Sequence, residues 1–367
     1  MIIAAQHKIN IPISKILIIQ LGDIGDVVWA IPTFHALKAA FPNAGLSVLT
    51  REPYGDLLLD DSSIENVFQT GKGNIFTQLN FLLRLRRNKF DLLFDLRADD
   101  RGTFMSFFSG ARMRCALHYP GMRWRDKAFT HLLQEPPPRE RMYGAAEQSL
   151  RIVRGFGINE ITYAPRISIS EKIKGKTEKL LADEHIGTEK AWVSINPFSR
   201  WAYKEWGMDK WRELALFIWR QYAMPAIVVG SAKESERASQ LVSEASSPMI
   251  NFAGKTTLLE MASLLQISRL HIGVDSAAPH IATAVGTPTV TIYGPTNWRD
   301  WVLPGDKNKV VLPDMDCSPC HKKGCDGNGR SECLETLSVT KVQHAVEKIL
   351  DNNITKSTDN TEVHECK

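Results

Sequence analysis

Short apolar segments recur along this 367-residue chain, and longer, more polar stretches of helical length separate them. Strand-length apolar runs that alternate with helical segments are typical of parallel sheets with helical crossovers. The pattern therefore predicts an α/β fold. The runs are Ile16–Ile19, Leu46–Leu49, Leu92–Leu96, Trp192–Ile195, Ala226–Val229, Leu270–Val274 and Thr289–Tyr293.

The length and the 43% hydrophobic content are enough for two ordinary domains, each with its own core. Residues 171–190 are rich in Lys, Glu and Gly and precede a new strand at Trp192. We therefore expect a boundary near residue 180, with domains at 1–180 and 181–350. The last periodic helix is expected from about Val339 to Leu350, and the polar residues 351–367 predict a disordered tail.

The charge and the apolar runs narrow the class of protein. The chain has no apolar run of about 18 residues or more, and its N-terminus is polar, so neither a membrane span nor a signal peptide is expected. We expect a cytoplasmic protein. A net charge of +4 is far from the strongly basic footprint of nucleic-acid-binding proteins, so nucleic acid is not an expected partner.

The first apolar run is followed by a turn that contains Gly22, Asp23, Gly25 and Asp26. In an open α/β sheet, a carboxylate at a strand's C-terminal end points at the ligand crevice. The turn lacks the three glycines of a dinucleotide fingerprint. Two interpretations stay open, because either aspartate can serve a bound hydroxyl or can cap the next helix. Pro32 leaves open whether that helix begins near Ile31 or earlier.

A second strand ends in a polar turn and an Ala-rich helix within residues 270–286. Asp275 or Ser276 can cap this helix, and the small Ala277 and Ala278 leave backbone N–H groups uncovered. Free amides at a helix N-terminus form a natural phosphate site. An ordinary well-capped helix is the alternative, but the following strand ends in a second small, polar turn, which favours a phosphate site.

The loop after Trp192–Ile195 holds Ser199 and Lys204 before Trp206. A lysine at a strand end can neutralise a pyrophosphate leaving group. The alternative is a solvated loop lysine beside a core tryptophan.

Taken together and in this order, these segments resemble glycosyltransferase family 9, the ADP-heptose:lipopolysaccharide heptosyltransferases. The resemblance implies a GT-B architecture of two Rossmann-like domains that face a cleft, with the acceptor on the first and the nucleotide sugar on the second. The motifs that carry it are Leu-Gly-Asp-Ile-Gly-Asp-Val at 21–27, Lys-Glu-Trp at 204–206, Gly-Ser-Ala-Lys-Glu-Ser-Glu-Arg at 230–237, Gly-Val-Asp-Ser-Ala-Ala-Pro-His at 273–280 and Tyr-Gly-Pro-Thr at 293–296.

The resemblance also implies roles for single residues. Asp26 matches the general base, and Lys204 matches a lysine that faces the donor phosphates and assists catalysis. Glu234, or Glu236 in its place, falls where an acidic residue holds the donor ribose. The donor-binding set is Ser199, Lys204, Glu234, Asp275, Ser276, Ala277, Ala278 and His280.

The acceptor side is predicted from a basic stretch with aromatic residues at 112–127. Arginine suits bidentate binding of phosphate and carboxylate groups, which are abundant in lipopolysaccharide core, and Trp124 or Tyr119 can stack on a sugar. A solvated basic face is the alternative. The expected acceptor-binding residues are Asp23, Arg97, Arg123 and Trp124. The basic segment 84–87 is read as a polar helix face, with contact to anionic lipid as the alternative.

Four cysteines lie in a C-x2-C-x4-C-x7-C pattern within a predicted loop, 317–333. Four thiolates in so short a span can hold zinc, with His321 as a substitute ligand. Reduced thiols are the alternative in a reducing cytoplasm. The four candidate zinc ligands are Cys317, Cys320, Cys325 and Cys333.

The sequence thus predicts an inverting, metal-independent transferase that moves heptose from ADP-heptose to a hydroxyl of the lipopolysaccharide inner core. Such a reaction needs a base for the acceptor hydroxyl and positive charge for the departing diphosphate. We expect it at the cytoplasmic face of the inner membrane, with transient contact to the membrane surface. Two alternatives stay open: the same fold with another nucleotide sugar, and a non-catalytic, metal-stabilised binding protein.

Overall fold

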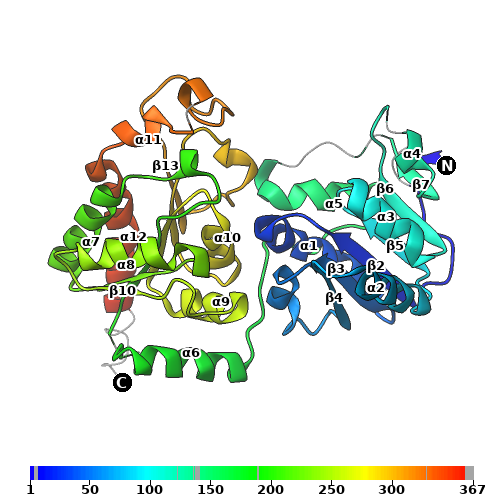
Figure 1. Ribbon diagram of the computed structural model, residues 1–367, viewed down its shortest axis with the longest axis horizontal. Helices are drawn as coiled ribbons and strands as arrows, with labels where there is room; N and C mark the ends of the chain where they lie inside the picture. The colour runs from blue at the N-terminus through cyan, green and yellow to red at the C-terminus, as the bar shows by residue number, and fades with distance from the viewer. Residues whose placement is uncertain are drawn as a thin grey trace. The chain divides into compact units, whose positions relative to one another are not determined.

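The computed structural model describes residues 1–3, 7–121, 123–134, 136, 141–187, 190–327 and 329–359. The chain divides into two compact units, Met1–Ile169 and Ser170–Lys367 (Figure 1). The division lies before the expected position near residue 180. Helix α6 (Glu171–Asp183) contacts α9 (Leu258–Ile267), so the Lys/Glu-rich segment belongs to the second unit.

In the described part of the first unit, seven strands form one parallel sheet in the order β1-β7-β6-β5-β2-β3-β4. The strands are β1 (Ile2–Ile3), β2 (Lys15–Gln20), β3 (Gly45–Arg51), β4 (Asn66–Thr70), β5 (Leu92–Asp95), β6 (Met113–Leu117) and β7 (His131–Leu133). The helices are α1 (Ile24–Ala40), α2 (Ile75–Arg87), α3 (Asp100–Ser109), α4 (Arg123–Asp126) and α5 (Glu147–Arg154), with 3-10 turns η1 (Tyr54–Leu58) and η2 (Arg141–Ala146).

Helices cover the central strands of this sheet, which explains why those strands read as continuous apolar runs. Side chains alternate along β2, and Leu17 and Ile19 share a core cluster with Leu85 of α2 and Met105 of α3. Helix α1 contacts α5 instead. The helices α2 and α3 therefore pack on the same face of the sheet.

The described part of the second unit contains a six-stranded parallel sheet in the order β10-β9-β8-β11-β12-β13. The strands are β8 (Val193–Asn196), β9 (Ala226–Val228), β10 (Met249–Asn251), β11 (Leu270–Val274), β12 (Thr289–Ile292) and β13 (Asn308–Val311). Besides α6 and α9, the helices are α7 (Met208–Tyr222), α8 (Ser235–Ser243), α10 (Ala277–Ala284), α11 (Glu332–Thr336) and α12 (Val339–Asp359), with 3-10 turns η3 (Ala202–Lys204), η4 (Ala232–Glu234), η5 (Trp298–Asp300) and η6 (Cys325–Gly327).

The C-terminal helix α12 contacts α7, β12 and β13 (Figure 1). Its apolar side chains Val342, Val346 and Leu350 are part of the core cluster of this unit. The helix continues to Asp359, beyond the expected end near Leu350 and into the segment expected to be a disordered tail. Residues 360–367 lie outside the described part of the chain.

Apart from the added edge strand β1, both sheets reverse their strand order once, between β2 and β5 in the first unit and between β8 and β11 in the second. This is the Rossmann order, in which ligands bind beside the carboxyl ends of the strands at the reversal. The predicted fold of two Rossmann-like domains is confirmed, and every predicted apolar run lies on a strand. Within the described residues, no helix is long and apolar enough to span a bilayer.

Candidate active site

The turn after β2 places Asp26 in the first turn of α1, which begins at Ile24 and runs through Pro32. The Asp26 carboxylate accepts the Asp23 N–H at 2.7 Å, as in a capping box. A side chain on Gly22 would overlap this carboxylate, so glycine is required there. Asp26 therefore caps the helix, and its position at the reversal between β2 and β5 still allows a catalytic role.

Arg97, which follows β5, donates to Asp26 Oδ2 at 3.1 Å. The Asp26 side chain is 15% exposed and that of Arg97 is 43% exposed. Burial raises the pKa of the Asp26 carboxyl above its ordinary value, and the Arg97 guanidinium opposes this shift. A carboxylate with a raised pKa beside a strand end is suited to accept a proton.

Asp95, at the end of β5, fixes the turn that carries Arg97. Its Oδ1 accepts hydrogen bonds from the N–H groups of Arg97 at 3.1 Å and Ala98 at 2.8 Å, and its Oδ2 accepts one from the Ser106 hydroxyl. Ala98 adopts a left-handed backbone conformation with φ of 50°. Burial raises the pKa of Asp95 to about 6.

This raised pKa predicts how the stability of the first unit depends on pH. Between about pH 4 and 6 the folded state keeps the Asp95 proton, whereas the unfolded chain releases it, so the free energy of unfolding falls as pH rises. Asp95→Asn removes this effect and retains the hydrogen-bonding shape. We expect the variant to gain up to about 3 kcal/mol relative to wild type between about pH 4 and pH 7.5, as measured by urea unfolding. If the variant and wild type differed in free energy of unfolding by the same amount at both pH values, this role of Asp95 would be contradicted.

Of the predicted acceptor residues, Asp23 and Arg97 lie at this sheet edge. Asp23 is ion-paired with Arg51, which also donates to the Gly22 carbonyl at 3.1 Å. Trp124, in α4, is exposed, and Arg125 lies 5.5 Å above its ring. The Arg123 side chain is outside the described part of the structure. The proposed acceptor contacts stay predictions.

The rest of the basic stretch is not a continuous basic face, because residues 113–117 form the inner strand β6. The Arg114 side chain turns back to the Ala128 and Ala111 carbonyls at 2.6 and 2.7 Å. Arg125 donates to the Ala98 carbonyl at 3.1 Å, which brings α4 beside the Arg97 turn. The exposed end of the stretch is therefore the part available to a ligand.

In the second unit, Lys204 and Asp275 meet at the reversal between β8 and β11. The Lys204 ammonium donates to Asp275 Oδ2 at 2.6 Å, and their side chains are 19% and 8% exposed. Each sheet thus places a carboxylate and a cation together at its reversal point. In the first unit the carboxylate, Asp26, follows β2 and the cation, Arg97, follows β5. In the second unit the order is opposite, because the cation follows β8 and the carboxylate follows β11.

Polar contacts fix the loops around this ion pair. Ser199 Oγ donates to the Asp275 carbonyl at 3.3 Å, and the Ser199 N–H donates to Glu205 at 3.0 Å. Ser276 Oγ donates to Asn196 Oδ1 at 2.9 Å. The predicted donor residues Ser199, Lys204, Asp275 and Ser276 are therefore brought together.

Helix α10 begins after Ser276, and the first N–H groups of a helix have no partner within it. Ala278 and His280 are buried, and Ala277 is half-buried. Burial lowers the pKa of His280 to about 4, so its ring is neutral near pH 7. Together with Lys204, this helix start is suited to a phosphate.

Tyr293 and Glu234 complete the surroundings. Tyr293 is fully buried, and burial together with the Asp275 charge holds the pKa of its hydroxyl well above the ordinary value. Glu234, after β9, accepts the Ser231 N–H at 2.6 Å in a capping box, whereas Glu236 is exposed. The ribose-binding role of Glu234 stays a prediction.

Comparison with known proteins adds to this geometry. The sequence model of glycosyltransferase family 9 (heptosyltransferase) matches residues 79–329. Lipopolysaccharide heptosyltransferase 3 of Escherichia coli K12 is 26% identical over 293 residues, which are 76% of this chain and 82% of that protein. The match covers more than half of the chain. The chain belongs to glycosyltransferase family 9.

Two solved structures agree with this family 9 membership in fold. The glycosyl transferase family 9 structure from Veillonella parvula has a TM-score of 0.79 at 19% identity, covering 92% of this chain and 97% of that chain. The structure of Escherichia coli ADP-heptose lps heptosyltransferase II has a TM-score of 0.72 at 19% identity, covering 92% and 99%. This family 9 protein is a glycosyltransferase, as the order of its motifs predicted.

The cysteine pattern of this family 9 chain gathers beside the donor loops. Ser331 donates to the Tyr203 carbonyl at 2.6 Å, and Ser318 donates to the Gly294 carbonyl at 2.7 Å. Burial, and the negative charge of the other three cysteines in their thiolate form, raise the pKa of Cys333 to about 11. Among the described side chains, no three His, Cys, Asp or Glu residues are arranged to hold a metal ion, and the zinc site stays a prediction.

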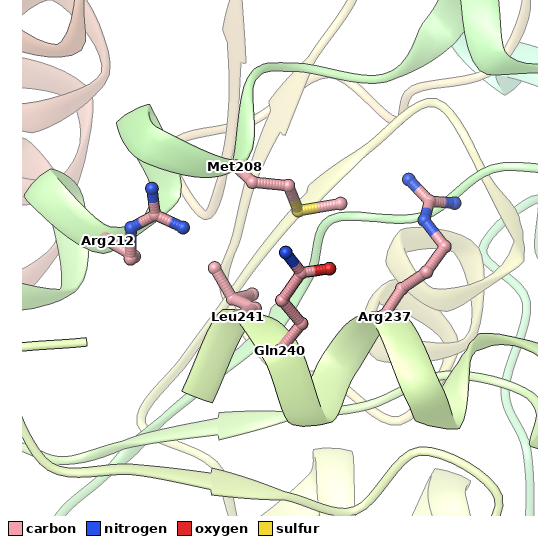
Figure 2. A pocket seen from close by; sticks show the side chains of 5 residues that line it. All are labelled: Met208, Arg212, Arg237, Gln240 and Leu241. Carbon is pink, nitrogen blue, oxygen red and sulfur yellow. The ribbon is translucent and has the colours of Figure 1, made fainter. Parts of the chain in front are cut away.

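A small pocket lies between α7 and α8. Figure 2 shows the arginines at opposite sides of it and the Met208 side chain between them. Arg212 is paired with Glu244 at 2.7 Å, and Arg237 with Glu205 at 2.6 Å. Both cations are thus already neutralised. The lining residues are Met208, Arg212, Arg237, Gln240 and Leu241.

Several residues that shape the site were missed by sequence reasoning: Arg51, Asp95, Asn196 and Glu205. Asp95 and Asn196 each stand at the end of an apolar strand, and that position is a signal that was available. Arg51 gave no such signal, because its partners Gly22 and Asp23 are distant in the sequence. Glu205 lies within the Lys-Glu-Trp motif, but its contacts with Ser199 and Arg237 appear only in the structure.

Proposed function

We propose that this chain transfers heptose from ADP-heptose to a hydroxyl of lipopolysaccharide inner core, with inversion at the anomeric carbon. Family 9 membership supports heptose transfer, and the Escherichia coli relative is named a lipopolysaccharide heptosyltransferase. The observation that carries the mechanism is the carboxylate–cation pair at the reversal point of each sheet.

In the proposed reaction, Asp26 removes the proton of the acceptor hydroxyl, whose oxygen forms a bond to the anomeric carbon. The bond from that carbon to the phosphate oxygen breaks, and ADP leaves with the electron pair. Lys204 and the N-terminus of α10 stabilise the growing negative charge on the diphosphate. Because these groups supply positive charge, we propose that the reaction needs no divalent metal.

Donor binding must then change the Lys204 and Asp275 pair. The ammonium is held by Asp275 at 2.6 Å, so diphosphate oxygens would compete with this carboxylate for it. We place the reaction at the cytoplasmic face of the inner membrane, where a nucleotide sugar and a lipid-linked acceptor can meet.

The direct test is incubation of the purified chain with ADP-heptose and heptose-bearing core oligosaccharide, followed by mass measurement of the acceptor and NMR of the new linkage. We expect a gain of one heptose with inverted configuration. Parallel reactions with ADP-glucose and UDP-glucose test the alternative of another donor sugar. Transfer from one of these, and none from ADP-heptose, would replace the proposed donor.

A further inference from the structure

The first unit carries an exposed apolar surface that its fold does not use. It is formed by α2 and α3, and we call it the α2–α3 face. Its side chains are between 38% and 75% exposed, which is unusual for a group of large apolar residues on one surface. The members are Ile75, Phe76, Leu79, Leu83, Phe104, Phe107 and Phe108.

Helix α2 is apolar on two sides. Leu85 packs into the core, with Phe81 and Leu82 against the same cluster. Ile75 and Leu79 are separated by one helical step of four residues, and Leu83 follows at the same interval, so these three form a strip along the exposed side. Packing explains the first side and leaves the second without a role inside this unit.

Helix α3 continues the surface. Its phenylalanine rings contact one another, with centroids of Phe104 and Phe108 4.4 Å apart and those of Phe107 and Phe108 5.4 Å apart. The two helices are in contact, and Arg86 of α2 lies against Gly110, the C-cap of α3. The exposed aromatic rings and the α2 strip are therefore neighbours on one side of the sheet.

Basic residues predominate around this surface. Residues 72–90 and 101–120 contain no acidic residue. Carboxylates stand at the ends of these segments. Asp91 accepts backbone N–H groups of residues 14 and 15. At the start of α3, the N-cap Asp99 pairs with Arg97, and the first residue, Asp100, pairs with Arg125. The basic residues of the α2 segment are Lys72, Arg84, Arg86, Arg87 and Lys89.

We propose that the α2–α3 face binds the surface of an anionic lipid bilayer. Helices that lie in a membrane interface typically carry phenylalanine and leucine on one side and lysine and arginine on the other. The basic side chains meet anionic head groups, and the apolar side chains enter the boundary with the acyl chains. Charge complementarity therefore favours a lipid surface over a second copy of the chain, whose same face would bring like charges together.

The location of the face gives this binding a use, and this step rests on the proposed function. Arg101, in the first turn of α3, donates to Thr70 at the carboxyl end of β4 at 3.1 Å. Both helices thus begin at the sheet edge that holds Asp26. A membrane-bound α2–α3 face keeps this edge beside the bilayer from which a lipid-linked acceptor projects.

The test is cosedimentation of the full chain with phosphatidylcholine vesicles, with and without phosphatidylglycerol. We expect binding that requires phosphatidylglycerol and falls with salt. Ile75→Ser/Phe76→Ser and Arg86→Gln/Arg87→Gln should each weaken it about tenfold or more. The matched controls, Ile161→Ser/Ile267→Ser and Lys172→Gln/Lys179→Gln, remove exposed groups elsewhere and should bind as wild type, with melting curves to confirm folding.

The proposal would be overturned if the control variants lost as much vesicle binding as the α2 variants, or if the α2 variants bound vesicles as wild type does. A dimer in sedimentation velocity that Phe76→Ser dissociates while no vesicle is bound would also overturn it. Transfer to soluble core oligosaccharide separates this question from the reaction. The α2 variants should keep that activity and lose transfer to vesicle-embedded acceptor, whereas a wild-type chain that binds vesicles but transfers no heptose would contradict the proposed function alone.

Discussion

Asp26→Asn is expected to lower kcat by about 10²- to 10⁴-fold, which is the usual contribution of a general base. The asparagine amide cannot take the acceptor proton. Its oxygen can still accept the Asp23 N–H that Asp26 accepts at 2.7 Å, so the start of α1 should be retained. Initial rates of heptose transfer, together with ADP binding by calorimetry, measure the two effects separately.

The matched control is Asp209→Asn, because Asp209 is an exposed carboxylate in the first turn of α7. It should transfer heptose as wild type does. Arg97→Gln tests the environment of the base. The Arg97 charge lowers the pKa of Asp26, so its removal raises that pKa, and the acidic limb of kcat/KM should move to higher pH. A turnover in Asp26→Asn close to wild type would remove Asp26 as the base.

Lys204→Met is expected to lower kcat by about 10²- to 10³-fold, since it removes positive charge where the diphosphate leaves. The variant also leaves the Asp275 carboxylate, which is 8% exposed, without its cation. An unpaired buried charge destabilises a protein, so a loss of activity by this variant alone has two explanations.

The double variant Lys204→Met/Asp275→Asn separates the loss of catalytic charge from destabilisation by an unpaired Asp275. It has no unpaired charge at the site, so its melting temperature should recover towards wild type, whereas its kcat should stay low. Lys233→Met, at an exposed lysine of η4, controls for the loss of a surface charge. Recovery of kcat in the double variant would show that Lys204 acts only by neutralising Asp275.

The sequence predicted the central strands well and the edges of the sheets poorly. Central strands such as β2 and β11 are buried on both faces, and so appear as unbroken apolar runs. The edge strands β4, β10 and β13 contain polar residues and are partly exposed, so their sequences carry no comparable pattern. Strand β6 was not predicted either, because it contains an arginine; the Arg114 side chain turns back to backbone carbonyls and is therefore compatible with an inner strand.

By itself, the sequence determined the parallel α/β class, the two-domain organisation and the turns that carry Asp26, Lys204 and Asp275, because hydrophobic periodicity and turn chemistry are local properties. Only the tertiary structure decided what those residues meet. Asp26 finds Arg97, and Lys204 finds Asp275, across 71 residues in each case. Such pairs form because the sheet order places β2 beside β5 and β8 beside β11, and strand order follows from how whole helices and strands bury their apolar faces, which no short stretch of sequence records.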